Sequence, residues 1–441
     1  MKGNLVGWTL PTTLNRMTLY GITGLTGLPL NYTGCTNFTS IYVYYSPMLA
    51  QNINDFHFDD NLRTIQFQGT SISGNVETFI MPTGCTQLEI RESKLTGNVS
   101  LMPLSNTLVN LNFSNNYLTG ELTDMTIPNS LNSLYLGGST NKITATFSSG
   151  NPFHTKNIYN ELYLDYMTGA TGIGISGDLS YLIFDNNLNN LNFQGSSMNC
   201  DLSKLNPAKI YSLWASYCST GLTGNLTNWL TGTTIFRTLY LNNSPNLSGN
   251  TTNWNVNGIN DLRINSTNLS GALKHNNVYI LYGYYTQISS NISGFSFTNQ
   301  GYDFNMNNCN LVGNLSSVTL KYSMYGFHVG GNANLYGSNE FVNYLFVNRK
   351  NFTSYYLFID IFALGDSVTG TSETLGSLGT WGGSQWDLSE AEVNNLVDGL
   401  DYNGSGSNTP WDSKNKIYWM KNAQISSVNP SRRYIYFQIT Y

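Results

Sequence analysis

The sequence contains few charged residues. Asp, Glu, Lys and Arg make up 10% of its 441 residues, Lys and Arg together number only 20, and the formal net charge is −5. Proteins that bind a nucleic-acid backbone carry a basic stripe, so nucleic acid is not expected as a partner. No run of 18 apolar residues occurs, so no segment is expected to span a membrane.

Residues that carry chemistry are also scarce. The four histidines are scattered, and no HExxH, GxxxxGK or GxSxG motif occurs. Nothing in the sequence assembles a nucleophile, a base and an orienting group, so we expect the protein not to be an enzyme. The cysteines are odd in number and irregularly spaced, which predicts buried free thiols rather than a disulfide framework. They are Cys35, Cys85, Cys200, Cys218 and Cys309.

What the sequence does contain is a repeat, seen in LVNLNFSNNYLTGEL from Leu108 to Leu122. With Phe113 as the anchor, apolar residues lie five and two positions before it and five and nine positions after it, and Asn116 lies three after it. The template recurs about every 23 residues along most of the chain. Its anchors are Leu19, Val43, Phe67, Ile90, Phe113, Leu136, Leu164, Phe193, Ala215, Leu241, Ile264, Gly283, Met306 and Val329.

Each repeat has two halves. The apolar-x-apolar core around the anchor has the period of a short strand. The second half, for example LTGNV after Lys94 and LSGAL after Asn268, places a Gly where the chain must turn sharply. So short a repeat cannot hold a strand plus a full crossover helix, so we expect the return side to be extended or 3₁₀. The sequence therefore predicts a β-rich solenoid of about 14 turns with one parallel inner sheet.

The position three after the anchor carries small side chains that can hydrogen-bond backbone groups in a tight inward bend. Ile22 and Met167 break this series. Its members are Ser46, Thr70, Ser93, Asn116, Ser139, Ser196, Cys218, Ser244, Thr267, Thr286, Cys309 and Asn332. The whole pattern resembles leucine-rich repeats, LxxLxLxx(N/S/T/C)xLxGxL, over roughly three quarters of the chain.

Two regions are predicted. Residues 1–340 form the solenoid, and residues 341–441 form a small α/β capping region with one helix over 389–400 and a terminal strand over 434–441. Ser389 is the N-cap of this helix and Glu392 completes a capping box. A similar LSxxEVxxLLxxL helix follows the repeats in some leucine-rich-repeat proteins of gut bacteria and their tailed phages, so the resemblance extends past the repeats.

One stretch is similar to a calcium loop of the EF-hand type. It runs from Asp401 to Asp412, with Gly406 at the sixth position and oxygen-bearing residues at the ligand positions. The alternative is a Ser/Asn/Gly-rich surface loop that matches by accident. The candidate ligands are Asp401, Asn403, Ser405, Ser407 and Asp412. No other metal or cofactor is expected.

The candidate binding site is the inner face, formed by residues one before and one after each anchor, which point away from the core. Aromatic rings beside amides and carboxylates suit both sugar stacking and protein hot spots. The alternative is that these are soluble fillers of an exposed sheet. The residues are Tyr42, Tyr44, Gln66, Gln68, Glu89, Arg91, Tyr135, Tyr163, Asp165, Trp214, Tyr240, Arg263, Tyr282, Tyr284 and His328.

The start of the chain bears on its partners. Gly3-Asn4-Leu5 looks like the tail of an LTGNL segment, so the first turn begins halfway through a repeat without a polar cap. An uncapped end exposes apolar surface. We therefore expect the N-terminal end to contact another virion or surface protein, unless a cap preceded it and has been removed.

The function follows from composition and setting. Tyr (30) and Gly (42) are abundant and no signal peptide is recognised. This balance is typical of secreted or virion surfaces, and a virus particle released by lysis needs no export signal. We predict a tail, baseplate or fibre protein of a tailed phage that binds a host surface protein or glycan or holds neighbouring virion proteins. The alternative is a bacterial cell-surface adhesin whose signal and anchor are missing from this chain.

Overall fold

The computed structural model describes residues 2–218, 221–232, 235–273, 278–295, 297, 303–321, 323–336, 341 and 344, and five later strands, 356–360, 380–381, 384–385, 416–420 and 434–438. The chain divides into two compact units, unit 1 (residues 1–224) and unit 2 (residues 225–441). Within the described residues, no helix is long and apolar enough to cross a membrane.

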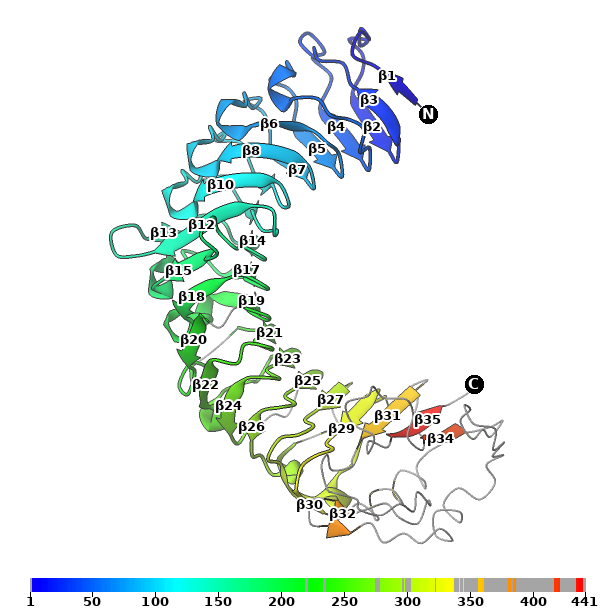
Figure 1. The fold of residues 1–441 in the computed structure, drawn as a ribbon, viewed down its shortest axis with the longest axis vertical. Helices are drawn as coiled ribbons and strands as arrows, with labels where there is room; N and C mark the ends of the chain where they lie inside the picture. Colours follow the sequence, from blue (N-terminus) through cyan, green and yellow to red (C-terminus); the bar gives the residue numbers. More distant parts are fainter. Residues whose placement is uncertain are drawn as a thin grey trace. The chain divides into compact units, whose positions relative to one another are not determined.

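Unit 1 is built from two parallel sheets, which Figure 1 shows as separate layers. The inner-face sheet takes the first strand of each turn, and neighbouring strands pair in chain order. Val43 pairs with Phe67 and Phe67 with Ile90, so the predicted anchors line up in adjacent turns. The strands are β2 (Arg16–Tyr20), β4 (Ser40–Tyr44), β5 (Thr64–Gln68), β7 (Gln87–Arg91), β9 (Asn110–Asn112), β11 (Ser133–Tyr135), β14 (Glu161–Tyr163), β17 (Leu188–Asn192) and β19 (Ile210–Trp214).

The second sheet of unit 1 takes the second strand of each turn. Its strands are β6 (Ser73–Asn75), β8 (Lys94–Asn98), β10 (Tyr117–Glu121), β12 (Lys142–Phe147), β15 (Ile175–Gly177), β18 (Met198–Asp201) and β20 (Leu222–Asn225). Two smaller parallel pairs are β1 (Lys2–Asn4) with β3 (Gly24–Gly27) and β13 (Phe153–His154) with β16 (Leu182–Ile183). β1 therefore lies where the second half of a repeat belongs, and the docking of this end onto a partner stays a prediction.

Short 3₁₀ helices complete the return side of the turns, as the repeat length predicts. In unit 1 they are η1 (Ile53–Asp55), η2 (Val76–Thr78), η3 (Val99–Leu101), η4 (Leu122–Asp124), η5 (Leu179–Tyr181), η6 (Leu202–Lys204) and η7 (Pro207–Lys209). The Asn75 side chain caps η2 by accepting from the Glu77 N–H at 2.9 Å. A Cβ on Gly97 of the next turn would lie 2.1 Å from Asn75 Oδ1, so the Gly of LTGN makes room for the preceding cap.

Unit 2 repeats the same plan. Its inner-face strands are β21 (Thr238–Tyr240), β23 (Asp261–Arg263), β25 (Ile280–Tyr282), β27 (Asp303–Asn305), β29 (Gly326–His328) and β31 (Tyr356–Asp360), paired in parallel. The second strands are β22 (Leu247–Asn250), β24 (Asn268–Gly271), β26 (Gln287–Ile288), β28 (Val312–Asn314) and β30 (Asn334–Tyr336). The 3₁₀ helices are η8 (Thr251–Asn253), η9 (Ile292–Gly294) and η10 (Leu315–Ser317).

Four further strands lie beyond residue 340. β35 (Tyr434–Gln438) pairs antiparallel with β31 and with β34 (Lys416–Met420), and β32 (Thr380–Trp381) pairs with β33 (Ser384–Gln385). β35 falls within the segment for which a terminal strand is predicted. The helix expected over 389–400 lies outside the described residues.

Both units make the same turn after the inner-face strand. The residue two after every anchor has a positive φ, which reverses the chain and aims the next residues into the core. The values lie between 51° at Tyr45 and 112° at Gly138. This row consists of Gly21, Tyr45, Gly69, Glu92, Asn115, Gly138, Tyr166, Gly195, Tyr217, Asn243, Ser266, Tyr285, Asn308 and Gly331.

The residue after this turn bridges neighbouring turns. Asn116 is fully buried and donates from Nδ2 to the carbonyls of Ile90 and Phe113, at 2.6 and 3.1 Å. Its Oδ1 accepts from the Leu95 N–H at 3.0 Å. Asn332 in unit 2 makes the equivalent bonds to the Met306 and Val329 carbonyls. Buried backbone groups in the bend thus find the partners that the sequence pattern predicts.

One member of the predicted series is wrong. In the turn after Leu136, Ser139 is exposed and Asn141 is the buried residue, because two extra residues lengthen the bend. Asn141 Oδ1 accepts from the N–H groups of Asn116 and Leu118 at 3.2 and 3.1 Å. Its Nδ2 donates to the Leu136 carbonyl at 2.9 Å and to the Phe113 carbonyl at 3.0 Å.

The cysteines are free and buried, as predicted. Cys218 and Cys309 donate to the carbonyl of the preceding anchor, at 3.3 Å to Phe193 and 3.1 Å to Gly283. Burial raises the pKa of the Cys85, Cys200 and Cys218 thiols to about 12. These side chains therefore stay protonated and act as packing groups.

Replacing Asn141 tests this account of the turn. Asn141→Ala should lower the free energy of unfolding in urea by about 3 kcal/mol, because each buried N–H or carbonyl left without a partner costs about 1–3 kcal/mol. Ser139→Ala is the matched control and should change the free energy by less than about 0.5 kcal/mol. Equal losses for the two variants would contradict the assignment of Asn141 to the bend.

Candidate functional site

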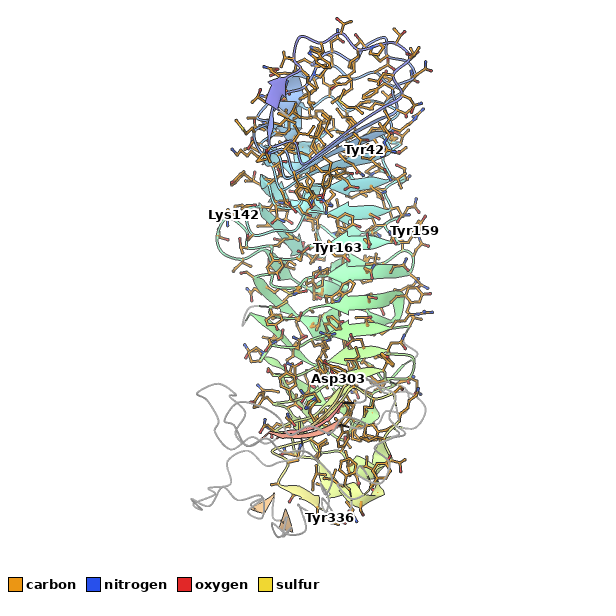
Figure 2. The ribbon with its side chains drawn as sticks, turned by 90° about the vertical axis from the view of Figure 1, so that its right-hand side faces the viewer. Tyr42, Lys142, Tyr159, Tyr163, Asp303 and Tyr336 are labelled. Atoms are coloured by element: carbon orange, nitrogen blue, oxygen red, sulfur yellow. The ribbon has the colours of Figure 1, made fainter. Side chains whose placement is uncertain are left out.

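The predicted inner-face residues lie on the inner-face strands, except Asp165 and Tyr284, which lie two residues after β14 and β25. Each is half-buried apart from Gln68, which is buried. Figure 2 looks onto this face, with Tyr42 and Tyr163 of unit 1 on its strands, Tyr159 on the right of the view and Lys142 of the second sheet on the left. Within each unit the side chains gather into clusters that the sequence alone did not reveal.

The first cluster of unit 1 joins strands β2, β4, β5 and β7. The Arg16 guanidinium lies over the Tyr42 ring, with Cζ 4.3 Å from the ring centre. The Tyr44 hydroxyl donates to Gln66 Oε1, and Gln66 Nε2 donates to Glu89 Oε1 at 3.0 Å. One hydrogen-bonded chain therefore crosses three successive strands, and it fixes these side chains in place.

The carboxylate of this cluster, Glu89, is half-buried. Burial raises the pKa of the Glu89 carboxyl above its usual value, although Arg91 and the hydrogen bond from Gln66 act to lower it. Arg91 Nη2 donates to Gln68 Oε1 at 2.8 Å. Arg91 and Glu89 are thus both occupied by neighbours on the face.

The second cluster of unit 1 is an aromatic ladder made of Tyr135, Tyr163 and Trp214. The ring centres of Tyr135 and Tyr163 lie 4.9 Å apart with an angle of 30° between the planes. Those of Tyr163 and Trp214 lie 6.0 Å apart at 40°. Asn192 of the intervening strand is buried, which lets the indole reach Tyr163. The rings of neighbouring turns therefore lie side by side along the sheet.

Two carboxylates flank the middle ring of the aromatic ladder. Glu161 precedes Tyr163 by two residues and Asp165 follows it by two, so all three point to the same side. Both carboxylates and burial raise the pKa of Tyr163 to about 12, burial most. Burial raises the pKa of the Asp165 carboxyl as well. A Cβ on Gly137 would lie 2.4 Å from Asp165 Oδ1, so this carboxylate rests on the bare backbone of the adjacent turn.

Unit 2 contains a third cluster, centred on Arg263. Its guanidinium pairs with Asp261 through two hydrogen bonds of 3.0 and 2.9 Å. Arg263 Cζ lies 4.4 Å from the Tyr240 ring centre and 5.1 Å from that of Tyr282. The Tyr240 hydroxyl donates to Asp261 Oδ2 at 2.6 Å, and burial together with this bond raises the pKa of Tyr240 to about 12. The cluster neutralises its own cation.

Asp303 and His328 meet beside this cluster. The Tyr282 hydroxyl donates to Asp303 Oδ2 at 2.5 Å. A Cβ on Gly326 would lie 2.3 Å from Asp303 Oδ1 and 2.9 Å from His328 Nε2, so both side chains lean over this glycine. Burial raises the pKa of the Asp303 carboxyl. Figure 2 labels Asp303 on the face of unit 2.

Sequence reasoning missed two sets of residues on this face. The first set comprises acidic residues three before an anchor, which are Glu161, Asp261 and Asp303. Side chains two apart on a strand share a face, so these residues lie on the same face as the residues one before the anchor. The second set comprises tyrosines two after an anchor, which are exposed by 46 to 60%. They are Tyr45, Tyr166, Tyr217 and Tyr285.

These four tyrosines occupy a costly conformation. Left-handed backbone costs a side chain with a Cβ about 1–2 kcal/mol, and the other turns place Gly, Asn, Ser or, in one case, Glu92 there. The Tyr166 ring lies over Gly195 of the next turn, where a Cβ would come within 2.5 Å of it. A bulky residue kept in such a position is a candidate for recognition rather than for stability. The signal in the sequence is Tyr at a position where the neighbouring repeats carry Gly, Asn or Ser.

The calcium-loop candidates, Asp401 to Asp412, lie outside the described residues. Among the described residues, no group of three or more His, Cys, Asp and Glu is placed to hold a metal ion.

The buried carboxylate of Asp165 gives stability a measurable pH dependence. The pKa of Asp165 is higher in the folded protein than in the unfolded chain. The contribution of Asp165 to the free energy of unfolding is therefore most favourable when the carboxyl is protonated, and it is lost as pH rises through the folded-state pKa. Asp165→Asn should therefore unfold at a higher temperature than the parent at pH 7, and the gap should close at about pH 3. Asp55→Asn, an exposed carboxylate in η1, is the control and should show no such gap. A gap for Asp165→Asn that does not change with pH would contradict this.

No protein-family model matches the chain, and no curated protein matches its sequence. Among solved structures it is similar to the leucine-rich-repeat ectodomain of the plant membrane receptor kinase GASSHO1/SCHENGEN3 from Arabidopsis thaliana, at 13% identity and a TM-score of 0.38, over 74% of this chain and 48% of that chain. A plant ice-binding protein follows at 19% identity and 0.32, over 54% and 68%. An internalin from Listeria monocytogenes follows at 13% and 0.37, over 74% and 80%. The chain thus spans about half the length of the plant ectodomain.

Proposed function

We propose that this chain is a non-enzymatic recognition protein that binds a protein ligand on the inner face of unit 1, at the aromatic ladder. The observation that carries the proposal is the contact of Tyr135, Tyr163 and Trp214 on an open sheet face. Half-buried Tyr and Trp side chains concentrate binding energy because they bury much apolar area with little loss of side-chain freedom.

The ring geometry favours a protein ligand over a glycan. A sugar stacks on an open ring face. In the aromatic ladder, ring centres 4.9 and 6.0 Å apart leave no room for a sugar ring to stack between neighbouring rings. Ring edges and hydroxyls then meet the ligand, together with the carboxylates of Glu161 and Asp165, and this mixture suits polypeptide side chains. The exposed rings of Tyr166 and Tyr217 extend the surface at the ends of the same strands.

The biological setting that we propose is the virion of a tailed phage, as a tail, baseplate or fibre component that recognises its host or holds neighbouring virion proteins. Low charge, abundant Tyr and Gly, and the likeness of the repeats to phage and gut bacterial proteins support it. The second candidate is a bacterial cell-surface adhesin, which the same repeats would serve. Gold-labelled antibody against this chain should decorate purified phage particles and not the surface of uninfected cells. Labelling of uninfected cells alone would favour the adhesin.

The binding site can be tested without knowing the natural partner. Peptides selected from a random displayed library against the native chain should lose at least about tenfold in affinity on Tyr163→Ala or Trp214→Ala, because each change removes a ring from the aromatic ladder. Tyr117→Ala is the matched control, since Tyr117 is exposed and begins β10 in the second sheet. Its affinities should stay within about twofold of the parent.

The opposite outcome is equally clear. Thermal unfolding first shows that all variants are folded. If the selected peptides then bind Tyr163→Ala and Trp214→Ala as tightly as the parent, the binding site lies elsewhere. A polysaccharide array that gives binding dependent on Tyr163 would replace the protein ligand by a glycan.

A further inference from the structure

We propose that the aromatic ladder of unit 1 takes up a basic side chain, Lys or Arg, of its polypeptide ligand, with the cation held by the carboxylates of Glu161 and Asp165. This inference rests on the proposed function and names the chemistry of the partner.

The charges on this part of the face all have one sign. The inner-face strands β9, β11, β14, β17 and β19 contain no Lys or Arg, and none occurs in the two residues after each of them. Glu161 and Asp165 stand on either side of Tyr163 on the same strand face. A ligand that covers the aromatic ladder therefore comes against two carboxylates, which attract a cation and repel an anion.

In the part of the chain that the structure describes, neither carboxylate is paired with a cation. Among the described residues, ion pairs join His154 with Asp185 and Arg263 with Asp261, and neither involves the ladder. Asn190 donates to Glu161 Oε1 at 3.2 Å. Because this amide is neutral, the negative charge of Glu161 stays uncompensated. A half-buried carboxylate without a counter-ion is held at a cost in free energy, and an arriving cation relieves it.

Unit 2 shows the same arrangement with the cation supplied from within. Arg263 lies against the rings of Tyr240 and Tyr282 and donates from Nε and Nη2 to the two carboxylate oxygens of Asp261. A stable unit forms on this sheet when a guanidinium lies between aromatic rings of the neighbouring strands and pairs with a carboxylate two residues before it on its own strand. The aromatic ladder of unit 1 has the rings and the carboxylates, and the ligand would supply the guanidinium or ammonium.

The ring geometry also explains why the cation comes on a long side chain. The half-buried rings of Tyr163 and Trp214 offer apolar surface that matches the methylene stem of Lys or Arg, while the charged end reaches the carboxylates. Gly137 keeps the space over Asp165 Oδ1 free of a side chain. A bare metal ion fits less well, because no three acidic, His or Cys side chains among the described residues come together there.

The test uses two defined probes on the full chain. One is an acetylated, amidated peptide of alternating Arg and Gly, and the other has Glu in place of Arg. The Arg peptide should bind the parent at least about tenfold more tightly than the Glu peptide, measured by calorimetry. Asp165→Asn combined with Glu161→Gln should weaken the Arg peptide about tenfold and leave the Glu peptide no weaker than before.

The matched control removes the same amount of charge elsewhere. Asp55→Asn with Asp124→Asn neutralises two exposed carboxylates on the 3₁₀ helices η1 and η4 and should leave affinity for the Arg peptide within about twofold. A loss in the control equal to that in the Asp165 and Glu161 variant would reduce the effect to net charge and overturn the inference. So would equal binding of the two peptides by the parent.

The two proposals can fail separately. Library peptides that depend on Tyr163 and Trp214 but carry no basic residue, and that ignore the loss of the Asp165 and Glu161 charges, would leave the binding site standing and reject its basic ligand. If library peptides bind Tyr163→Ala and Trp214→Ala as tightly as the parent, and the Arg peptide binds the Asp165 and Glu161 variant as tightly as the parent, both proposals are rejected.

Discussion

The turn that follows each inner-face strand is the constraint on which the rest of the structure depends. Two residues after the anchor the backbone takes a positive φ, and the next inward residue bonds backbone groups of its own and the neighbouring turn. The bend would otherwise bury unpaired N–H and carbonyl groups, each at a cost of about 1–3 kcal/mol. All the turns share the positive φ, and all but those with Ile22 and Met167 place a residue able to hydrogen-bond in the bend, so the anchors stay in register from one turn to the next.

Register converts a sequence position into a row on the surface. Residues at one offset from the anchor lie side by side in successive turns, as Tyr135 and Tyr163 do. Side chains that are far apart in the sequence thereby become neighbours, and their chemistry depends on which turns carry which residue. An Arg at such an offset gives the closed cluster around Arg263, and its absence beside Tyr163 leaves two carboxylates facing outward.

Much of this could be predicted from the sequence, because the period and the anchor pattern have a single structural meaning. The anchors, the inner-face strands, the 3₁₀ return side and the bridging role of Asn116 follow from it. The sequence could not show that Asn141, rather than Ser139, is the buried residue of its turn. The turn has two extra residues, and nothing in the pattern shows whether they come before or after the buried position. The tyrosines at positive φ were missed for a related reason. Propensity argues against Tyr in a left-handed turn, and only the conformation of the neighbouring repeats reveals that Tyr166 and Tyr217 adopt it. The contact of Tyr163 with Trp214 depends on the burial of Asn192 between them, which is a fact of packing.

Deleting one whole turn tests this account most directly. Removal of residues 94–116 joins Ser93 to Tyr117, so that the first residue of β10 takes the place of the first residue of β8 and the register of every remaining turn is kept. The account predicts that this shortened chain keeps its β-sheet circular dichroism and unfolds cooperatively, whereas removal of residues 94–105, about half a turn, abolishes both. Equal loss of structure in the two deletions would contradict a fold in which each turn is held by its immediate neighbours.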